Sequence, residues 1–282
     1  MGLFSKVLLT VDFDRTITAP DSSIPEANLA AIRYFMAEDG AFTVNTGRSV
    51  PMFAPYLNAI PHNAPWLLYN GSAAYDGEEL SQLREIPLDR GAFFQALRRK
   101  FPELNIEEQG IGGHYTYWDN PVFQEFYRQV GAAHRQMVLE ENHEPFLKVS
   151  LFGSPRAYCV ADLFDATAEE EAYFSQAVEW LKEAYGDKIE VFRAASRIID
   201  IHAKGVSKIA SARQLQKNLG REILVCVGDA ENDLPMLLGA DYAFCPADGV
   251  VADRFPNVCP CGEGAVAQVI YEKIPEILGI NP

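Results

Sequence analysis

The chain has 282 residues, of which 48% are hydrophobic and 22% charged, a balance typical of a soluble globular protein and not of a disordered or fibrous one. Its net charge of −15 argues against nucleic acid or an anionic membrane surface as a partner. No apolar stretch approaches the ~20 residues that span a bilayer. The five cysteines lack paired C-x-x-C spacing, so we expect a cytoplasmic protein with free thiols.

The first predicted element is a buried strand at residues 7–11, followed by two aspartates. The segment VLLTV is short, aliphatic and β-branched, which favours a strand of a parallel sheet over a helix. Such a strand delivers its next side chains to the carboxyl edge of the sheet, where open α/β folds bind ligands. Asp12 and Asp14 have the same parity, so in an extended chain they point to one side and need a cation or a proton between them. Two solvated acids in a loop are the alternative interpretation.

Strand and helix patterns alternate over the first 86 residues. Pro25 suits the first turn of a helix, and Gly40 suits its C-terminal cap. The predicted elements are a crossover helix at 24–40, a buried strand within the segment 41–49 that ends at Thr46 and Gly47, a short or distorted helix at 50–57, and a strand with a turn at 65–76.

Residues 87–196 show a different pattern, which predicts an α+β domain inserted into the first. The strand and helix alternation then resumes, with a predicted core strand at 197–203 and a helix that begins after Ser207 and stops at Gly220. The predicted core is therefore made of residues 1–86 and 197–282. The segments expected within the insertion are a helix at 93–101, alternating segments at 114–118 and 147–153, a long helix at 166–186 and a strand at 189–194.

Polar residues at the ends of other predicted strands and helices combine with Asp12 and Asp14 into one group of catalytic residue types. Thr46 closes a strand, Lys208 opens a helix, and the segment GDAEND places Asp229, Asn232 and Asp233 after a buried strand. Each has an ordinary alternative as a turn residue, a solvated lysine or a loop that caps a helix. Carboxylates that share a site need a hard cation, and magnesium prefers oxygen ligands while leaving room for substrate phosphate. Together these residues suit phosphoryl transfer.

Four segments, DFDRTIT, TVNTGRS, GVSK and VGDAENDLPML, resemble in this order the four motifs of the haloacid dehalogenase superfamily. With the insertion between the second and third, the chain resembles the Cof-type phosphatases, which carry a large α/β cap of type II. GEGAVAQVI also resembles the start of the C-terminal helix of that family. The resemblance spans nearly the whole chain, and it implies an α/β fold with a doubly wound, Rossmann-like parallel sheet and the inserted domain at 87–196 as a cap over its active edge.

The resemblance also implies roles for individual residues. Asp12 is the nucleophile, Asp14 the general acid and base, and Lys208 the cation of the third motif. The residues expected to bind phosphate are Thr16, Thr46, Gly47, Lys208 and Asn232, and those expected to bind Mg²⁺ are Asp12, Asp14, Asp229 and Asp233. Apart from the resemblance, Arg48 is a further candidate for a contact to an anion or to the cap, because it directly follows the predicted phosphate turn at Thr46 and Gly47.

These roles are chemically consistent. A carboxylate that attacks phosphorus forms an aspartyl phosphate, which replaces one difficult displacement by two easier ones. Asp14 would give a proton to the departing alkoxide and then take one from water. Position 15 departs from the family pattern, because Arg15 stands where glycine is usual. Either the backbone there needs no positive φ or some strain is accepted, and we expect the guanidinium to face solvent.

The sequence therefore predicts a magnesium-dependent phosphomonoester hydrolase that acts on a small soluble phosphate ester, with sugar phosphates as candidates. We expect no nucleic-acid or membrane partner, and a monomer or weak homo-oligomer. A phosphomutase with the same site and a non-catalytic phosphate-binding regulatory protein are the alternatives. Residues 111–128, rich in aromatic side chains, either face a sugar-like leaving group or belong to the cap's own core.

Overall fold

The computed structural model describes residues 2–118, 128, 134–153 and 165–280. The chain forms two compact units. The core unit comprises Met1–Gly47, Pro55–Ser81 and Ser207–Pro282, and the cap unit comprises Arg48–Ala54 and Gln82–Val206. None of the helices in the described ranges is both long enough and apolar enough to cross a membrane.

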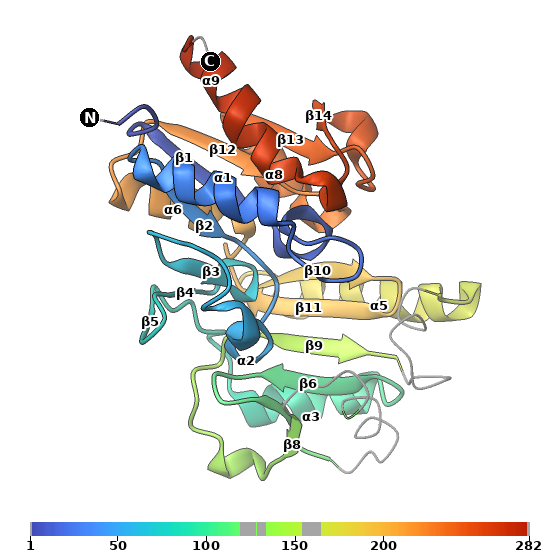
Figure 1. The fold of residues 1–282 in the computed structure, drawn as a ribbon. Helices are drawn as coiled ribbons and strands as arrows, with labels where there is room; N and C mark the ends of the chain where they lie inside the picture. Colours follow the sequence, from blue (N-terminus) through green and yellow to red (C-terminus); the bar gives the residue numbers. More distant parts are fainter. Residues whose placement is uncertain (1, 119–127, 129–133, 154–164, 281–282) are drawn as a thin grey trace. The chain divides into compact units, whose positions relative to one another are not determined.

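The core unit is built on a parallel sheet with the strand order β14-β13-β12-β1-β2 (Figure 1). The chain proceeds outward from β1 to β2, returns, and proceeds outward again from β12 in the opposite direction. This reversal confirms the predicted doubly wound sheet and places its switch point between β1 and β12. The strands are β1 (Val7–Val11), β2 (Ala41–Val44), β12 (Ile223–Val227), β13 (Tyr242–Pro246) and β14 (Asn257–Val258).

Helices cover both faces of this sheet. In Figure 1, α1 and α8 lie in front of the sheet and α6 lies behind it. On the face of α6, Leu8, Leu224 and Cys226 of the strands pack against Ala212 and Leu215 of the helix. The helices are α1 (Glu26–Ala37), α6 (Lys208–Asn218), α7 (Leu234–Leu238), α8 (Ala265–Gln268) and α9 (Ile274–Leu278).

Two predicted helix ends can be compared with the structure. α6 has the predicted N-cap, because the Ser207 hydroxyl accepts a hydrogen bond from Ala210 N, and Gly220 follows with a φ of +63°. At the end of α1, however, Asp39 and not Gly40 takes the left-handed conformation, with a φ of +65°. Gly40 is needed for another reason, since a Cβ there would lie 2.4 Å from the ring of Phe35.

A small antiparallel sheet extends the core unit after β2. Asn45 forms a parallel bridge to Leu67, and the predicted turn follows at Tyr69–Gly71. Residues 50–57 form the predicted distorted helix, a single turn of α2 (Val50–Phe53) followed by a 3-10 turn. The strands of the small sheet are β3 (Trp66–Leu68), β4 (Ala73–Tyr75) and β5 (Leu80–Ser81).

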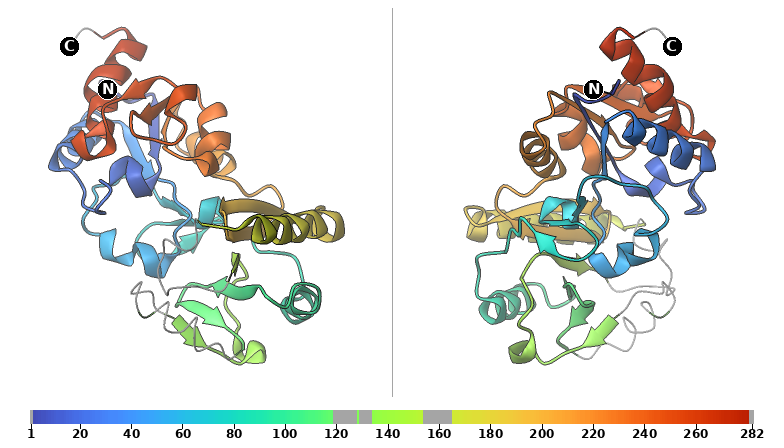
Figure 2. Two further views of the ribbon diagram at one scale, coloured as in Figure 1. Left: turned by 90° about the vertical axis from the view of Figure 1, so that its right-hand side faces the viewer. Right: turned by 60° about the vertical axis from the view of Figure 1, so that its left-hand side comes forward.

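The cap unit contains a mostly antiparallel sheet with the order β10-β11-β9-β6-β7-β8. One face packs against two helices, α3 (Arg90–Lys100) and α5 (Ala168–Tyr185), and α5 runs along the sheet in Figure 2. The strands are β6 (Asn105–Gln109), β7 (His114–Thr116), β8 (His134–Gln136), β9 (Val149–Phe152), β10 (Ile189–Ala195) and β11 (Ile198–Ala203).

The assignment of residues 197–203 to the core sheet is wrong. β11 pairs antiparallel with β9 and β10, so it belongs to the cap sheet. The apolar and polar residues of β11 alternate. Ile199 and Ile201 lie in the hydrophobic cluster between the cap sheet and helices α3 and α5, and Asp200 and His202 lie on the other face of the sheet. Such alternation is typical of an antiparallel strand and not of a core strand buried on two apolar faces.

The aromatic segment at 111–128 lies partly outside the described residues. Within the described part, Tyr115 is buried, and Tyr117 and Trp118 pack against the hydrophobic cluster of the cap unit. These residues therefore belong to the cap's own core, as one of the two interpretations held. The four cysteines that the structure describes form no disulfide, in line with the predicted free thiols, and Cys159 lies outside the described residues.

Candidate active site

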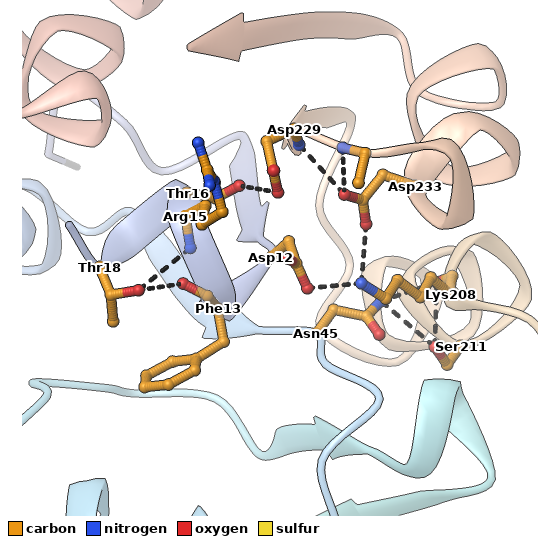
Figure 3. Close-up of polar contacts among 11 residues, drawn as sticks. Asp12, Phe13, Arg15, Thr16, Thr18, Asn45, Lys208, Ser211, Asp229 and Asp233 are labelled. Carbon is orange, nitrogen blue, oxygen red and sulfur yellow. Dashed lines mark hydrogen bonds and ion pairs between the residues drawn. The ribbon is translucent and has the colours of Figure 1, made fainter. Parts of the chain in front are cut away.

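Four of the predicted site residues, Asp12, Lys208, Asp229 and Asp233, lie close together at the carboxyl edge of the core sheet, beside the switch point (Figure 3). Asp12 directly follows β1, and its backbone N donates to the carbonyl of Val227, the last residue of β12. Asp229 and Asp233 follow β12, and Lys208 is the first residue of α6. All four residues are buried. The edge therefore collects charged groups in a place where water does not surround them.

Lys208 joins two of the carboxylates. Its Nζ lies 2.5 Å from Asp12 Oδ1 and 2.7 Å from Asp233 Oδ1. The backbone of Lys208 is held in turn, because Asn45 Nδ2 at the end of β2 donates to its carbonyl at 2.8 Å, and Ser211 Oγ donates to the same carbonyl at 3.0 Å. Burial by itself lowers the pKa of Lys208, but the carboxylates of Asp12 and Asp233 raise it above its ordinary value, so the ammonium stays charged.

The loop after β12 fixes the other two carboxylates. Asp233 Oδ2 accepts from the backbone N of Asp229 at 3.1 Å and of Ala230 at 3.2 Å. Gly228 permits this close approach, since a Cβ there would lie 2.7 Å from the Asp233 side chain. Asp229 Oδ1 accepts from Thr16 Oγ1 at 3.1 Å. The two aspartates are thus oriented by backbone and hydroxyl donors.

The electrostatic balance of the cluster is negative. Carboxylate oxygens of Asp12, Asp229 and Asp233 all lie within 4.8 Å of one another, and they share one lysine. Burial, and then the charge of Asp233, raise the pKa of Asp12 well above its usual range and that of Asp229 to about 6. A divalent cation would neutralise the surplus charge, and a donor set made only of oxygens suits magnesium. These three residues therefore fit a magnesium ion.

The turn that follows Asp12 contains the unusual Arg15. Its backbone adopts the left-handed conformation, with a φ of +57°. Thr18 holds the turn, because its Oγ1 accepts from Arg15 N at 3.1 Å and donates to the carbonyl of Phe13 at 3.2 Å. Of the two expectations for position 15, the structure shows the strained one, and the Arg15 side chain is exposed as expected.

The other predicted site residues differ from one another in burial and in packing. Thr46 is buried, and Gly47 packs so closely on Asn70 that a Cβ would lie 2.9 Å from Asn70 Oδ1. Asn232 is exposed in the turn before Asp233. Asp14 is also exposed, and among the described residues the group of mutually close carboxylates does not include it.

Arg48 is assigned to the cap unit, where its Nη1 donates to the carbonyl of Met52 at 3.4 Å. Sequence reasoning missed Asn45, which ties the end of β2 to Lys208. The signal was present, because an asparagine in an otherwise apolar buried strand end needs hydrogen-bond partners.

Comparisons with known proteins identify the family and the fold. Residues 9–251 match the family of haloacid dehalogenase-like hydrolases. A solved haloacid dehalogenase-like hydrolase from Bacteroides thetaiotaomicron has a TM-score of 0.75 and 20% identity, with 95% of this chain and 98% of that chain covered. A sugar phosphatase of subclass IIB of the same superfamily has a TM-score of 0.72 and 18% identity, with 97% and 99% covered.

One curated relative is a longer protein. The chain is 22% identical over 264 residues to a chloroplastic endoribonuclease, YBEY, of Arabidopsis thaliana. The match covers 84% of this chain but 41% of that protein, so the chain spans less than half the length of this relative. At these identities the likenesses to solved structures establish the fold, and the activity has to be argued from the site.

Proposed function

Because the chain belongs to the haloacid dehalogenase-like hydrolase family, we propose that it is a magnesium-dependent phosphomonoester hydrolase. The observation that carries the proposal is the meeting of Asp12, Asp229 and Asp233 around Lys208 at the carboxyl edge of the sheet. The sugar phosphatase of the same fold supports a small phosphate ester, a sugar phosphate among the candidates, as the substrate.

In the first step Asp12 attacks phosphorus. Lys208 binds Oδ1 of this carboxylate, which leaves Oδ2 for the attack. A bond forms between Oδ2 and phosphorus while the bond from phosphorus to the ester oxygen breaks, and the departing alkoxide takes a proton from Asp14. The products of this step are an alcohol and an aspartyl phosphate on Asp12.

In the second step water attacks the phosphorus of the aspartyl phosphate. Asp14, now ionised, takes a proton from this water, and the bond between phosphorus and Asp12 breaks. Inorganic phosphate leaves, and both aspartates return to their starting states. Asp14 is exposed at the turn after β1, so it can reach a substrate oxygen outside the buried cluster.

The remaining residues of the edge bind and orient the phosphate in this proposal. The Thr46 hydroxyl, the Asn232 amide and the backbone N–H groups of Thr16 and Gly47 supply donors, and Lys208 supplies a fixed positive charge. Arg48 remains a proposed contact for an anionic group. Asp12, Asp229 and Asp233 would hold Mg²⁺, which would act as a Lewis acid that neutralises charge on the phosphoryl oxygens. Asp14 lies outside this group of close carboxylates, so in this proposal it serves as acid and base and not as a ligand.

A phosphate-release screen over a panel of small phosphoesters, with and without magnesium, tests the proposal. We expect Asp12→Asn to lower kcat by at least about 1,000-fold, since it removes the nucleophile while it preserves shape. Asp21→Asn is the matched control, because Asp21 is an exposed acid that accepts from Ser23 outside the site.

Circular dichroism and thermal unfolding establish that both variants fold. Activity of Asp12→Asn within tenfold of the wild type would contradict covalent catalysis by this residue. Transfer of the phosphoryl group to a sugar without net phosphate release would identify a phosphomutase. Binding of phosphoesters with no turnover for any of them would identify a regulatory protein.

A further inference from the structure

The cap sheet has a polar face that the proposed function does not use. Ile106, Leu151 and Ile199 point into the hydrophobic cluster under α3 and α5, so the residues that alternate with them lie on the opposite face. Glu107, Ser150 and Asp200 are direct neighbours across β6, β9 and β11. The polar side chains of this face, each no more than 5% exposed, include Glu107, Gln109, Lys148, Ser150 and Asp200.

Hydrogen bonds across this face fix the orientation of Gln109. Ser150 Oγ donates to Asp200 Oδ1 at 2.7 Å, so it accepts from Gln109 Nε2 at 3.2 Å. The same Nε2 donates to Glu107 Oε1 at 2.8 Å. Both partners of Nε2 are acceptors, which identifies this atom as the NH₂ end of the amide. The carbonyl oxygen of Gln109 therefore points elsewhere.

Two acceptor atoms on β6 are left without a partner. Glu107 Oε2 and Gln109 Oε1 are buried and have no hydrogen-bond partner in the described part of the chain. The two residues are separated by one position, so their side chains lie on the same face of the strand. A buried acceptor of this kind destabilises the fold when it stays unsatisfied. A group that occupies this place must therefore donate hydrogen bonds.

The charge of Glu107 indicates which donor fits. Asp200 on the same face has a lysine partner, because Lys148 Nζ lies 2.8 Å from its Oδ2. Glu107 has no lysine or arginine partner among the residues that the structure describes, and its Oε1 faces Gln109 and His114 Nδ1, the latter at 3.2 Å. Among the described residues, the basic group that faces this buried carboxylate is the imidazole of His114, which lies on the Oε1 side and is charged only when protonated. The Oε2 side has no such group in the described part of the chain, so a positive donor fits better there than a neutral one.

A metal ion fits this place less well than an organic cation. Mg²⁺ and Ca²⁺ take six to eight oxygen ligands. Within the described ranges, Glu107 is not part of any group of three residues whose atoms could hold a metal together. Here one carboxylate oxygen and one amide oxygen are available, which matches the two or three hydrogen bonds of a single ammonium group.

We propose that Glu107 and Gln109 form a binding site in the cap unit for a primary ammonium group on a small organic molecule. Glu107 Oε2 accepts a charge-assisted hydrogen bond from the ammonium, and Gln109 Oε1 accepts a second one. The ammonium group belongs either to the leaving group of the substrate or to a separate effector. The first source rests on the proposed phosphatase function, whereas the binding site itself does not.

Direct binding to the full-length protein is the first test, with ethanolamine hydrochloride as the probe and ethylene glycol with potassium chloride as the reference. We expect calorimetric titration to detect ethanolamine and not the reference. Glu107→Gln should weaken ethanolamine binding at least about tenfold, because it removes the charge and keeps the shape. Glu190→Gln, which changes a half-buried glutamate of β10 paired with Lys204, is the matched control and should not weaken it.

Gln109→Met is a second variant that removes only the neutral acceptor, and we expect it to weaken binding as well. Equal heats for ethanolamine and the reference, or unchanged binding in Glu107→Gln, overturn the proposal. Potassium chloride alone giving the same response as ethanolamine also overturns it, because it identifies a site for an inorganic cation.

Activity assays with matched esters distinguish the two sources. If the substrate carries the ammonium, kcat/KM for glucosamine 6-phosphate should exceed that for glucose 6-phosphate at least about tenfold, and Glu107→Gln should bring the ratio close to one. If an effector carries it, free ethanolamine should change kcat/KM for glucose 6-phosphate. Turnover without ethanolamine binding refutes the ammonium site alone, and binding without turnover of any ester refutes the phosphatase alone.

Discussion

Each unit of this protein buries a lysine among carboxylates, but in different proportions. In the cap unit Lys148 and Asp200 form a pair at 2.8 Å, and Ser150 supplies a further hydrogen bond to the aspartate. In the core unit Lys208 contacts two carboxylates, and a third lies within 4.8 Å of both.

The two arrangements differ in their effect on the pKa values of the aspartates. Although burial opposes it, the Lys148 ammonium contributes to holding the pKa of Asp200 below its usual range. Burial, followed by Asp233, instead raises the pKa of Asp12 and Asp229. A balanced buried pair is thus complete without a ligand, whereas the surplus of carboxylates in the core unit is the feature that supports the proposed cation.

Of the changes that test this difference between the units, removal of the metal is expected to have the largest effect, and it acts on phosphate release. Chelation should abolish phosphate release, since the three carboxylates then repel both one another and the substrate. Magnesium should restore activity. Calcium should compete with magnesium as an inhibitor, because it accepts seven or eight ligands and readily binds both oxygens of a carboxylate, including the attacking oxygen of Asp12. The measurement is phosphate release from metal-stripped protein.

Two outcomes would contradict the metal prediction. Full activity in chelator would mean that Lys208 alone balances the cluster. Turnover with calcium equal to that with magnesium would mean that the metal leaves both oxygens of Asp12 available. In either case the surplus of carboxylates in the core unit would need another explanation.

Replacement of each buried lysine by methionine, in two separate variants, compares the two units directly. Lys208→Met and Lys148→Met should each lower the free energy of unfolding by roughly 3–5 kcal/mol, because each leaves a buried carboxylate without its cation. Saturating magnesium should restore part of this loss in Lys208→Met and none in Lys148→Met. Urea unfolding of both variants with and without magnesium measures the difference, and equal responses to magnesium would refute it.

The cap unit should show its own pH dependence through Glu108. Burial raises the pKa of this carboxyl to about 7, although Tyr117 and Arg90 act to lower it. In the unfolded chain the group loses its proton near its ordinary value of 4.5. The folded state therefore binds more protons between these values, and the free energy of unfolding should fall as pH rises from 4.5 to 7.

Ionisation of Glu108 should lower the free energy of unfolding by at most about 3 kcal/mol over this pH range. Asp229 contributes with the same sign, because its pKa is also raised, to about 6. The difference between the wild type and Glu108→Gln, each unfolded in urea at pH 5 and pH 8, isolates Glu108. The same dependence on pH in both proteins would show that Glu108 is ionised throughout.

The parts of the fold that could be predicted are those specified by local sequence. β1 is a continuous aliphatic run and is fully buried, so the position of Asp12 at the sheet edge follows directly. Ser207 caps α6 by a hydrogen bond within its own first turn. Convergence of Asp12 and Asp229 then follows from the rule that parallel strands share a carboxyl edge.

The parts that were missed depend on partners far away in the sequence. β6 has the sequence NIEEQ, which shows no apolar pattern, and it is a strand because Glu107 and Gln109 find partners on β9 and β7. β11 was assigned to the wrong sheet, since an isolated strand sequence does not reveal which strand it pairs with. Tertiary pairing decides such segments, and local propensity does not.

The smallest expected effect concerns the backbone at Arg15. A residue with a side chain costs about 1 kcal/mol or more in the left-handed region, whereas glycine adopts it without strain. Arg15→Gly and Arg15→Ala remove the same charge near Asp229, so the difference between them reports only the backbone. Because Ala keeps the strain and Gly relieves it, Arg15→Gly should be more stable by about 1 kcal/mol, less the entropy that glycine loses on folding. Urea unfolding of the two variants measures this difference. Equal stability would show that the turn relaxes to a negative φ, and the strain at this position would then have no energetic consequence for the core unit.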